Sequence, residues 1–249
     1  MNFPAFSDAR LRDIVDMRVS LDFEETYQDP RDDFARYRRA GLLEPAVPGD
    51  TPDSLIAFLA TLQKRAVEHG GPFHHCSPNS DVLGLVIERA TGQRFADFVA
   101  TRLWQPLGLR QDGYITVDAT GAARTGGCFC ITPRDFARIG EMIRLGGIVD
   151  GRRILSADWV SDTVTNGSAE AWSAGKFVDW LPDGRYRNKW FHTGNPSRAF
   201  SALGIHRQHL YVDPAAELVV AKFSSQPEPV NNDFNRLTLA LFDALARLN

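Results

Sequence analysis

The stretch FHHCSPNSDVLGLVIERATG, Phe73 to Gly92, decides how the rest of the chain is interpreted. It begins as a polar loop and becomes a helix with marked ends. Ser77 is a good N-cap, Pro78 suits the first helical position, and Gly92 supplies the C-terminal stop. Apolar residues at helical spacing should form the buried face: Val82, Leu83, Val86, Ile87 and Ala90. A polar loop fixed to the first turn of a buried helix can hold a reactive side chain still, so this stretch predicts a functional site.

The composition of the 249 residues is that of a globular enzyme domain. With 43% hydrophobic and 24% charged residues, the chain can build one sizeable core or two small lobes. A net charge of -3 and the lack of a long basic run argue against nucleic acid or an anionic membrane as partner. The three cysteines (Cys76, Cys128 and Cys130) show no zinc-like pairing, and no apolar run suits a membrane span or a signal peptide. We therefore expect a cytoplasmic protein with reduced thiols.

The spacing of apolar residues changes along the chain from helical to strand-like. We expect a mainly helical lobe in residues 1–147 and antiparallel strands with a terminal helix in residues 148–249, within a single domain. One antiparallel sheet should contain Ala199 to Ile205, His209 to Val212 and Leu218 to Ser224. Five apolar residues share one side of the terminal helix, which we expect to cover that sheet: Phe234, Leu237, Leu241, Leu245 and Leu248.

The opening stretch resembles the second catalytic motif of the serine β-lactamase and penicillin-binding-protein superfamily, in particular of its class C-like esterases and 6-aminohexanoate-dimer hydrolases. That motif has the form F-x-Y-x-S-x-N-[ST]-D-x-L-G, with a following helix that ends in E-x-A-T-G. Every position fits except the tyrosine, which is His75 here. The resemblance continues through residues 94–109, 126–147 and 210–225. It implies an α+β, β-lactamase-like fold, with an antiparallel sheet flanked by helices and a mainly helical lobe.

The resemblance also implies roles for residues of this loop. Ser77 and Asn79 occupy positions of the proton relay. His75 could replace the tyrosine as relay, because imidazole titrates near neutrality, or the motif could have decayed. Glu25 and Tyr27 match an E-x-Y segment that leans over the active site in the related amide hydrolases, with Glu25 toward the substrate. For Tyr27, a loop tyrosine that merely packs is an equal alternative.

A further motif of the superfamily is a K-T-G-like strand segment, in which the N–H after the glycine forms part of the oxyanion hole. His192-Thr193-Gly194 matches an H-T-G variant by letter. Counting back from Asp213-Pro214 places the strand instead on residues 202–214, with the oxyanion N–H at Ile205. We favour this second register and expect the His192 triplet to lie in a loop.

The favoured register also assigns neighbouring residues. His206 and Gln208 would line the substrate cleft. Arg207 departs from the family pattern, because a glycine is usual at this position. Its side chain could crowd or charge the cleft.

The nucleophile motif, S-x-x-K, places a serine hydroxyl at a helix start and a lysine one turn later. Among four lysines, only Lys176 has a serine three residues before it, Ser173. Gly175 lies inside the turn that would have to hold both side chains on one face, and the pair follows the central motif instead of preceding it, so chance explains it better. We expect the nucleophile outside these 249 residues, before Met1, and regard the chain as an N-terminally shortened family member.

Other reactive groups give weaker interpretations. His74, His75 and Cys76 are consecutive and cannot easily face one ion, so we expect no metal and no cofactor. A Cys76 nucleophile paired with His75 would define a different enzyme class.

Three functions are therefore open. The family implies a serine hydrolase that acts on a small amide or ester through an acyl-enzyme. The alternatives are an inactive binding module that keeps a ligand cleft, and one part of a two-chain assembly completed by an N-terminal segment. A homo-oligomer is also open.

Overall fold

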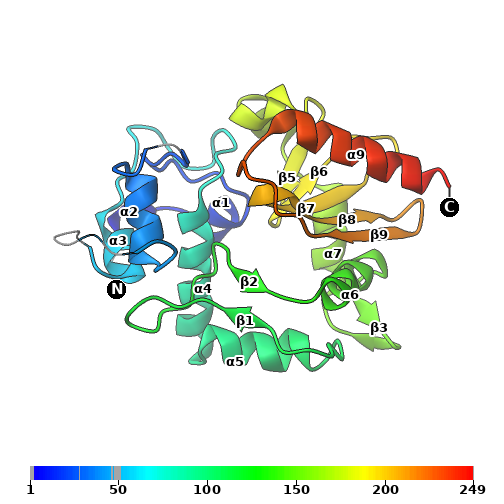
Figure 1. The fold of residues 1–249 in the computed structure, drawn as a ribbon, viewed down its shortest axis with the longest axis horizontal. Helices are drawn as coiled ribbons and strands as arrows, with labels where there is room; N and C mark the ends of the chain where they lie inside the picture. The colour runs from blue at the N-terminus through cyan, green and yellow to red at the C-terminus, as the bar shows by residue number, and fades with distance from the viewer. Residues whose placement is uncertain (1–2, 28, 46, 48–51, 249) are drawn as a thin grey trace. The chain divides into compact units, whose positions relative to one another are not determined.

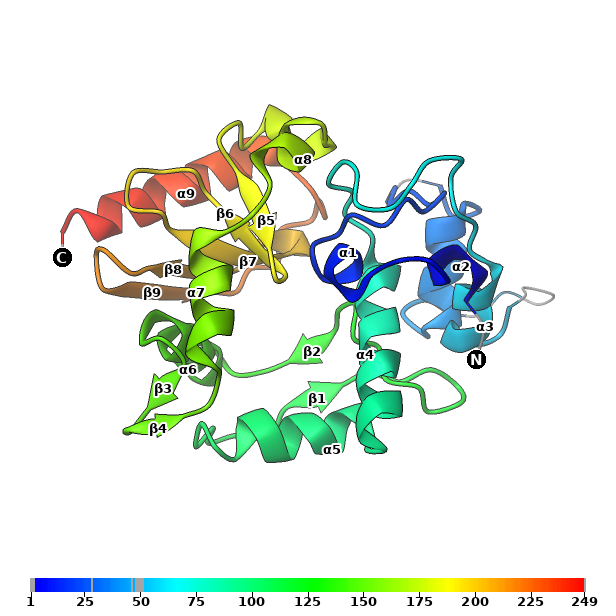
Figure 2. The ribbon, with the colours of Figure 1, turned by 180° about the vertical axis from the view of Figure 1, so that it is seen from behind.

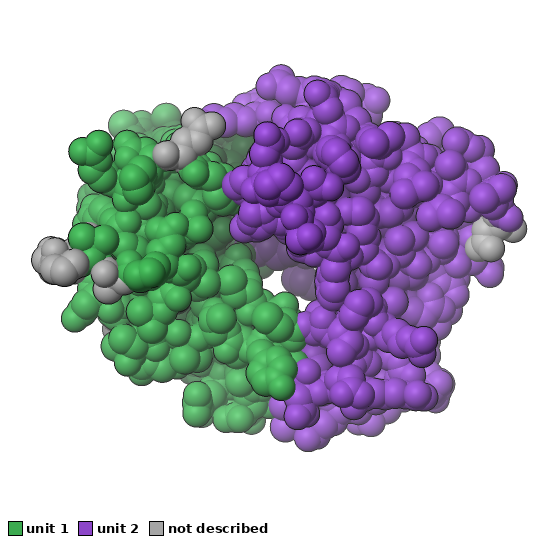
Figure 3. Space-filling view, viewed as in Figure 1, with its two compact units in different colours: residues 1–99, 113–130 green, residues 100–112, 131–249 purple. Residues whose placement is uncertain are grey.

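The structure, a computed structural model, describes residues 3–27, 29–45, 47 and 52–248. It forms two compact units, shown in different colours in Figure 3: unit 1 comprises residues 1–99 and 113–130, and unit 2 comprises residues 100–112 and 131–249. Helices and antiparallel strands occur together, as expected for an α+β fold. The division differs from the expected one after residue 147, because the helix at residues 133–144 belongs with the sheet. The single-domain organisation stays a prediction.

The elements follow one another as labelled in Figure 1. Unit 1 holds η1 (Pro4–Phe6), α1 (Leu11–Val15), α2 (Asp33–Ala40), α3 (Leu55–Thr61), α4 (Ser77–Thr91), α5 (Phe95–Val99), β1 (Tyr114–Ile115) and β2 (Phe129–Cys130). Unit 2 holds η2 (Ala100–Trp104), α6 (Pro133–Arg144), β3 (Ile148–Val149), β4 (Arg152–Arg153), α7 (Ala157–Thr165), α8 (Ala169–Ser173), η3 (Lys176–Asp179), β5 (Arg185–Arg187), β6 (Trp190–His192), β7 (Phe200–Gly204), η4 (Ile205–Arg207), β8 (Gln208–Asp213), β9 (Leu218–Lys222) and α9 (Asn232–Ala246). Within the described ranges, every helix is too short or too polar to cross a membrane.

Helix α4 of unit 1 lies beside α1 (Figure 2). Its predicted end is confirmed, because Gly92 adopts a left-handed conformation with φ of 67°. The predicted N-cap is wrong by one residue: Cys76 is the N-cap and Ser77 begins the helix. The Ser77 N–H finds its acceptor in the carboxylate of Glu25, so the helix start does not need a serine cap.

The buried face of α4 also differs in part from the prediction. Val82 is buried, whereas Ala90, which we expected inside, is exposed. Gly84 and Leu85 are buried instead. Gly84 faces Thr125 so closely that only a glycine fits there, which explains a small residue in the middle of the helix.

An aromatic cluster around Phe23 forms the core of unit 1. Phe23 makes edge-to-face contacts with Phe34, Tyr37 and Phe58, with ring centroids 5.7 to 6.2 Å apart. These three side chains come from α2 and α3, so the cluster joins both helices to the segment that holds Phe23. Glu25 follows Phe23 by two residues and is therefore anchored next to this core.

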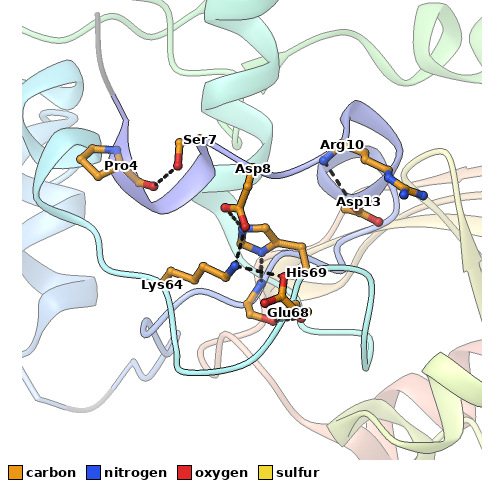
Figure 4. Close-up of polar contacts among 9 residues, drawn as sticks. Pro4, Ser7, Asp8, Arg10, Asp13, Lys64, Glu68 and His69 are labelled. Carbon is orange, nitrogen blue, oxygen red and sulfur yellow. Dashed lines mark hydrogen bonds and ion pairs between the residues drawn. The ribbon is translucent and has the colours of Figure 1, made fainter.

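A polar cluster fastens the N-terminal segment to residues 64–69 of unit 1 (Figure 4). Lys64 Nζ donates to Asp8 Oδ2 at 2.6 Å, and His69 Nε2 lies 3.1 Å from Asp8 Oδ1. The Ser20 N–H donates to His69 Nδ1 at 3.1 Å. The hydrogen bond from Lys64 lowers the pKa of Asp8. We assign this cluster a structural role.

Unit 2 is built on a five-stranded antiparallel sheet with the order β5-β6-β7-β8-β9 (Figures 1 and 2). Strand residues alternate between its faces. Val212 of β8 packs in one core cluster with Met142 of α6, and Tyr211 packs in another with Phe242 of α9. The sheet therefore lies between α6 and α9, and the three strands predicted from residues 199–224 are confirmed.

The prediction of which side of α9 faces the sheet is wrong. The predicted residues are all exposed, from 37% for Leu245 to 85% for Leu248: Phe234, Leu237, Leu241, Leu245 and Leu248. Asn235, Thr238 and Phe242 are buried instead. The position of the sheet, and not the number of apolar side chains on each face, decides which side of the helix is buried.

The close contact at Gly84 gives a test of packing in unit 1. In Gly84→Ala, the new Cβ would lie 2.5 Å from Thr125 Cγ2, so backbone or side chain must shift. We expect a loss of about 1–3 kcal/mol in the free energy of unfolding, measured by urea titration. The matched control is Gly127→Ala, whose Cβ meets nothing within 4 Å. Equal losses in both variants would contradict this account of α4 packing.

Candidate active site

Two residues of the predicted relay loop in unit 1 contact the carboxylate of Glu25. Its Oε1 accepts the Ser77 backbone N–H, and the Ser77 hydroxyl adds a further hydrogen bond to the same carboxylate. His75 Nδ1 lies 3.3 Å from Glu25 Oε2. The structure thus brings together Ser77, His75 and Glu25. The predicted contact of Glu25 with substrate stays a prediction.

Glu25 carries its negative charge inside the protein. Burial works to raise the pKa of this carboxyl, but the charge of His75 and the hydrogen bonds from His75 and Ser77 outweigh it and lower the pKa. Glu25 is therefore ionised at neutral pH. Hydrogen bonds to an ionised acceptor are stronger than those to a neutral one.

Asn79 and Tyr27 lie near this group, with other contacts. Asn79 is fully buried, and its Nδ2 lies 3.3 Å from Met17 Sδ. Tyr27 packs edge-to-face on Phe34, with centroids 4.8 Å apart. The structure thus gives each a packing contact, and their roles in the reaction stay predictions.

The burial of the Cys76 thiol argues against the alternative of a Cys76 nucleophile paired with His75. Cys76 is fully buried, and its Sγ lies 3.7 Å from the Phe23 carbonyl oxygen. The imidazole within 3.5 Å of this sulfur belongs to His74. A buried thiol in this position has no access to substrate.

A buried polar group behind the loop was missed by the sequence analysis. The Tyr37 hydroxyl donates to Asp81 Oδ2, and the Gly126 N–H donates to Asp81 Oδ1 at 2.6 Å. Arg124 lies over the Tyr37 ring, 4.1 Å from its centroid. Burial raises the pKa of Asp81 although Arg124 and these donors oppose the shift. Asp81 fits a letter of the family motif, which is the one signal that could have found this group.

The predicted oxyanion segment in unit 2 lies where β7 turns into β8. Gly204 ends β7, and Ile205, which is 45% exposed, begins the turn η4. His206 Nδ1 bonds the Gln226 carbonyl oxygen at 2.7 Å, and the Gln208 amide makes two hydrogen bonds to the Ser224 backbone. These side chains hold residues 224–226, so the predicted substrate contacts of His206 and Gln208 stay predictions.

The backbone conformation of Arg207 gives a reason for the glycine that is usual at this position. Its φ is 73°, in the left-handed region that favours glycine, and His206 before it has a φ of 56°. The Arg207 side chain is only 3% exposed, and within the described residues its Nε and Nη2 have no hydrogen-bond partner. Burial lowers the pKa of this guanidinium. It lies beneath α9, where Nη1 donates to Asn235 Oδ1, and therefore does not crowd the surface at Ile205.

The structure also places the two other motif candidates, the His192 triplet and the Ser173–Lys176 pair. The expectation that the triplet lies in a loop is confirmed for Thr193 and Gly194 but wrong for His192, which ends strand β6. His192 pairs with Phe200, at the opposite end of β7 from Gly204. Ser173 ends α8, and its hydroxyl donates to the Glu170 carbonyl oxygen. Lys176 lies in the next element, η3, so the two side chains do not share one helix start.

The fold and the motif in α4 define the class. Residues 1–244 match the family model described as Beta-lactamase. The chain therefore belongs to the Beta-lactamase family, and its α+β, β-lactamase-like fold is confirmed.

Its relatives are hydrolases. A 6-aminohexanoate-dimer hydrolase from Paenarthrobacter ureafaciens is 38% identical over 216 residues, 87% of this chain and 54% of that protein. The structure of a Bacillus anthracis protein assigned as a 6-aminohexanoate-dimer hydrolase matches with a TM-score of 0.86 and 25% identity, over 98% of this chain and 62% of that one. A β-lactamase/D-alanine carboxypeptidase from Yersinia pestis shares the fold, with a TM-score of 0.61 and 15% identity over 95% and 70% of the two chains. The chain spans about half the length of the curated relative it matches.

The buried pair of Tyr37 and Asp81 can be tested by removing one hydroxyl. In Tyr37→Phe, the ring and its contact with Arg124 remain, but Asp81 loses a donor inside the protein. We expect the free energy of unfolding to fall by about 1–3 kcal/mol in urea titrations. Tyr114→Phe, at a side chain that is 69% exposed, is the control and should leave it unchanged. An unchanged midpoint in Tyr37→Phe would show that Asp81 does not depend on this donor.

A buried histidine on β8 predicts a pH dependence of stability. Burial, with the charges of Lys222 and Arg207, lowers the pKa of His209 to about 4. The unfolded chain, with its ordinary pKa near 6.5, binds the proton first as the pH falls, so this stability is present above pH 6.5 and is lost toward pH 4.

Between pH 7 and pH 5, His209 should lower the free energy of unfolding by about 2 kcal/mol. His209→Leu removes the titrating group, so its urea midpoint should change less with pH than that of the unmodified chain. Both proteins should show the same pH slope between pH 7 and pH 8. The expectation fails if the two proteins lose equal stability between pH 7 and pH 5.

Proposed function

We propose that this chain contributes to a serine hydrolase that cleaves a small amide or ester through an acyl-enzyme. The observation that carries the proposal is the arrangement at the start of α4, where Ser77 and His75 are held together by the ionised carboxylate of Glu25. Membership of the Beta-lactamase family supports the reaction class. Linear amides of amino acids are the proposed substrates, because the 38% identical relative is named for a 6-aminohexanoate dimer.

The proposed reaction divides the work between named groups. A serine hydroxyl attacks the carbonyl carbon, and the N–H of Ile205 stabilises the oxyanion that forms. His75 and Ser77 carry the proton that the leaving amine or alcohol needs when the bond to the carbonyl carbon breaks. Water then attacks the carbonyl carbon of the acyl-enzyme and gives a proton to the same relay. The relay returns this proton to the serine oxygen as the ester bond breaks.

The attacking serine is proposed to belong to polypeptide outside these 249 residues. Support comes from the geometry of the S-x-x-K candidate within the chain, which does not suit a nucleophile. Ser173 and Lys176 lie on separate elements, and the Ser173 hydroxyl donates a hydrogen bond to the Glu170 carbonyl oxygen. The matched part of this chain covers only 54% of the Paenarthrobacter relative. That relative therefore contains further residues that could include such a segment.

The test fuses the part of the Paenarthrobacter relative that this chain does not cover to the N-terminal end of this chain. A fluorophosphonate probe should label the chimera and leave the 249-residue chain unlabelled. The chimera should hydrolyse 6-aminohexanoate dimer or a p-nitrophenyl ester, and Ser77→Ala should lower its kcat/KM by about 10²- to 10⁴-fold. Ser161→Ala, on the solvent-facing side of α7, is the control and should keep the activity of the chimera.

Two outcomes would contradict the proposal. Labelling of the 249-residue chain that disappears in Ser173→Ala would place the nucleophile at Ser173. A chimera that folds and is labelled, but hydrolyses neither substrate, would favour a binding module over a hydrolase.

A further inference from the structure

An open cavity of about 760 Å³ lies within unit 2, beside the edge strand β5 of the main sheet. Its walls come from α7, from α8, from the residues around the start of β5 and from the segment that joins β6 to β7. Helices α7 and α8 both pack beside β5 (Figure 2). His192 lines the cavity from the end of β6, at the opposite end of β7 from Gly204. A cavity of this size can hold a small organic molecule.

Four charged side chains line this cavity, two of each sign: Arg185, Arg198, Glu170 and Asp183. All four residues are exposed. Among the residues that the structure describes, none of these four side chains has a hydrogen bond or an ion pair. The arginines and the acids therefore do not neutralise one another by direct contact, and their charges are available to a ligand.

The segment that carries Arg198 is held in one conformation. Arg198 has a φ of 58°, which costs a residue other than glycine about 1–2 kcal/mol. The Ala199 N–H donates to Asn195 Oδ1 at 2.9 Å, and the Thr193 hydroxyl donates to the Ala199 carbonyl oxygen at 2.9 Å. Asn195 Nδ2 donates in turn to Asp243 Oδ1 of α9 at 3.0 Å. These bonds fix the backbone from which the Arg198 side chain extends, as a binding site requires.

A buried histidine adds a polar group to the cavity wall. His192 is 8% exposed, and its Nε2 has no hydrogen-bond partner within the described ranges. Burial lowers the pKa of His192, a hydrogen bond with the Thr163 backbone opposes the shift, and the charge of Arg185 lowers the pKa further. The ring is therefore neutral at pH 7 and leaves the balance of charges unchanged. A polar group of a ligand, or a water molecule that the ligand holds, could supply the missing partner.

The balance of charges indicates the class of ligand. An anion without a positive group would meet Glu170 and Asp183, and a cation without a negative group would meet the two arginines. Each would face like charges, which is unfavourable. A zwitterion offers a carboxylate to the guanidinium groups, which bind it through parallel N–H donors, and an ammonium group to the acids. Because Glu170 and Arg198 come from different walls of a large cavity, a linear ligand with its charges at opposite ends fits best.

We propose that this cavity binds a linear amino acid, with its carboxylate held by Arg185 and Arg198 and its terminal ammonium group held by Glu170 and Asp183. The site goes beyond the proposed hydrolase and does not depend on it, because binding makes and breaks no covalent bond. Cleavage of a linear amide of amino acids would release ligands of this class. The proposed reaction would therefore supply the ligand of this second site.

The direct test measures binding to the 249-residue chain by isothermal titration calorimetry, with three probes of equal carbon number. These are 6-aminohexanoate, hexanoate, which lacks the ammonium group, and hexylamine, which lacks the carboxylate. We expect 6-aminohexanoate to bind at least about tenfold more tightly than either, because each of the others loses one charged contact. Absence of saturable 6-aminohexanoate binding, or equal affinity for all three probes, would overturn the proposal.

Two variants locate the binding in the cavity. Arg198→Gln and Glu170→Gln each remove one charge at an exposed residue, so the urea midpoint should stay unchanged while the affinity for 6-aminohexanoate falls by about tenfold. The matched control is Arg152→Gln, at an exposed arginine of β4 outside the cavity, which should keep the affinity. Unchanged affinity in either cavity variant would overturn the proposal. An inactive chimera would contradict the proposed hydrolase alone and would leave these measurements unaffected.

Discussion

One buried carboxylate organises the candidate site. Glu25 lies two residues after Phe23, the centre of the aromatic cluster, so its backbone is anchored by the core of unit 1. Its two oxygens reach the first turn of α4 and the ring of His75. The loop that this charge holds supplies donors that stabilise it, from Ser77 and His75. The same contacts therefore fix the loop and the acid.

Unit 2 contains a tight chain reversal at the end of β7. His206 and Arg207 both adopt left-handed conformations, which cost non-glycine residues about 1–2 kcal/mol each. The turn is held by hydrogen bonds from the His206 N–H to the Pro229 carbonyl oxygen and from Lys222 Nζ to the Arg207 carbonyl oxygen. These contacts keep the chain reversal at Ile205–Arg207 in place, so that β8 can return beside β7. The guanidinium of Arg207 is turned into the layer between the sheet and α9, which leaves Ile205 at the surface.

Sequence could predict the features that depend on neighbouring residues. The end of α4 at Gly92, three of the five strands of the main sheet and the family motif all follow from local spacing and from residue types. Contacts between distant segments were out of reach. The contacts of Glu25 with Ser77 and His75 could not be predicted, because they join distant segments of the chain, and its expected contact with substrate stays a prediction. Tyr37 and Arg124 were missed for the same reason, since nothing in their local sequence marks them as partners of Asp81. The side of α9 was misjudged because apolar periodicity cannot say where the sheet lies.

The apolar side of α9 has a thermodynamic meaning of its own. Large aliphatic and aromatic side chains from Phe234 to Leu248 keep hydration water along much of the length of the helix. Release of that water favours any surface that covers the stripe, and the attraction strengthens on warming near room temperature. Adhesion to this helix would therefore be recognised by a negative change in heat capacity, even where it forms no new hydrogen bond.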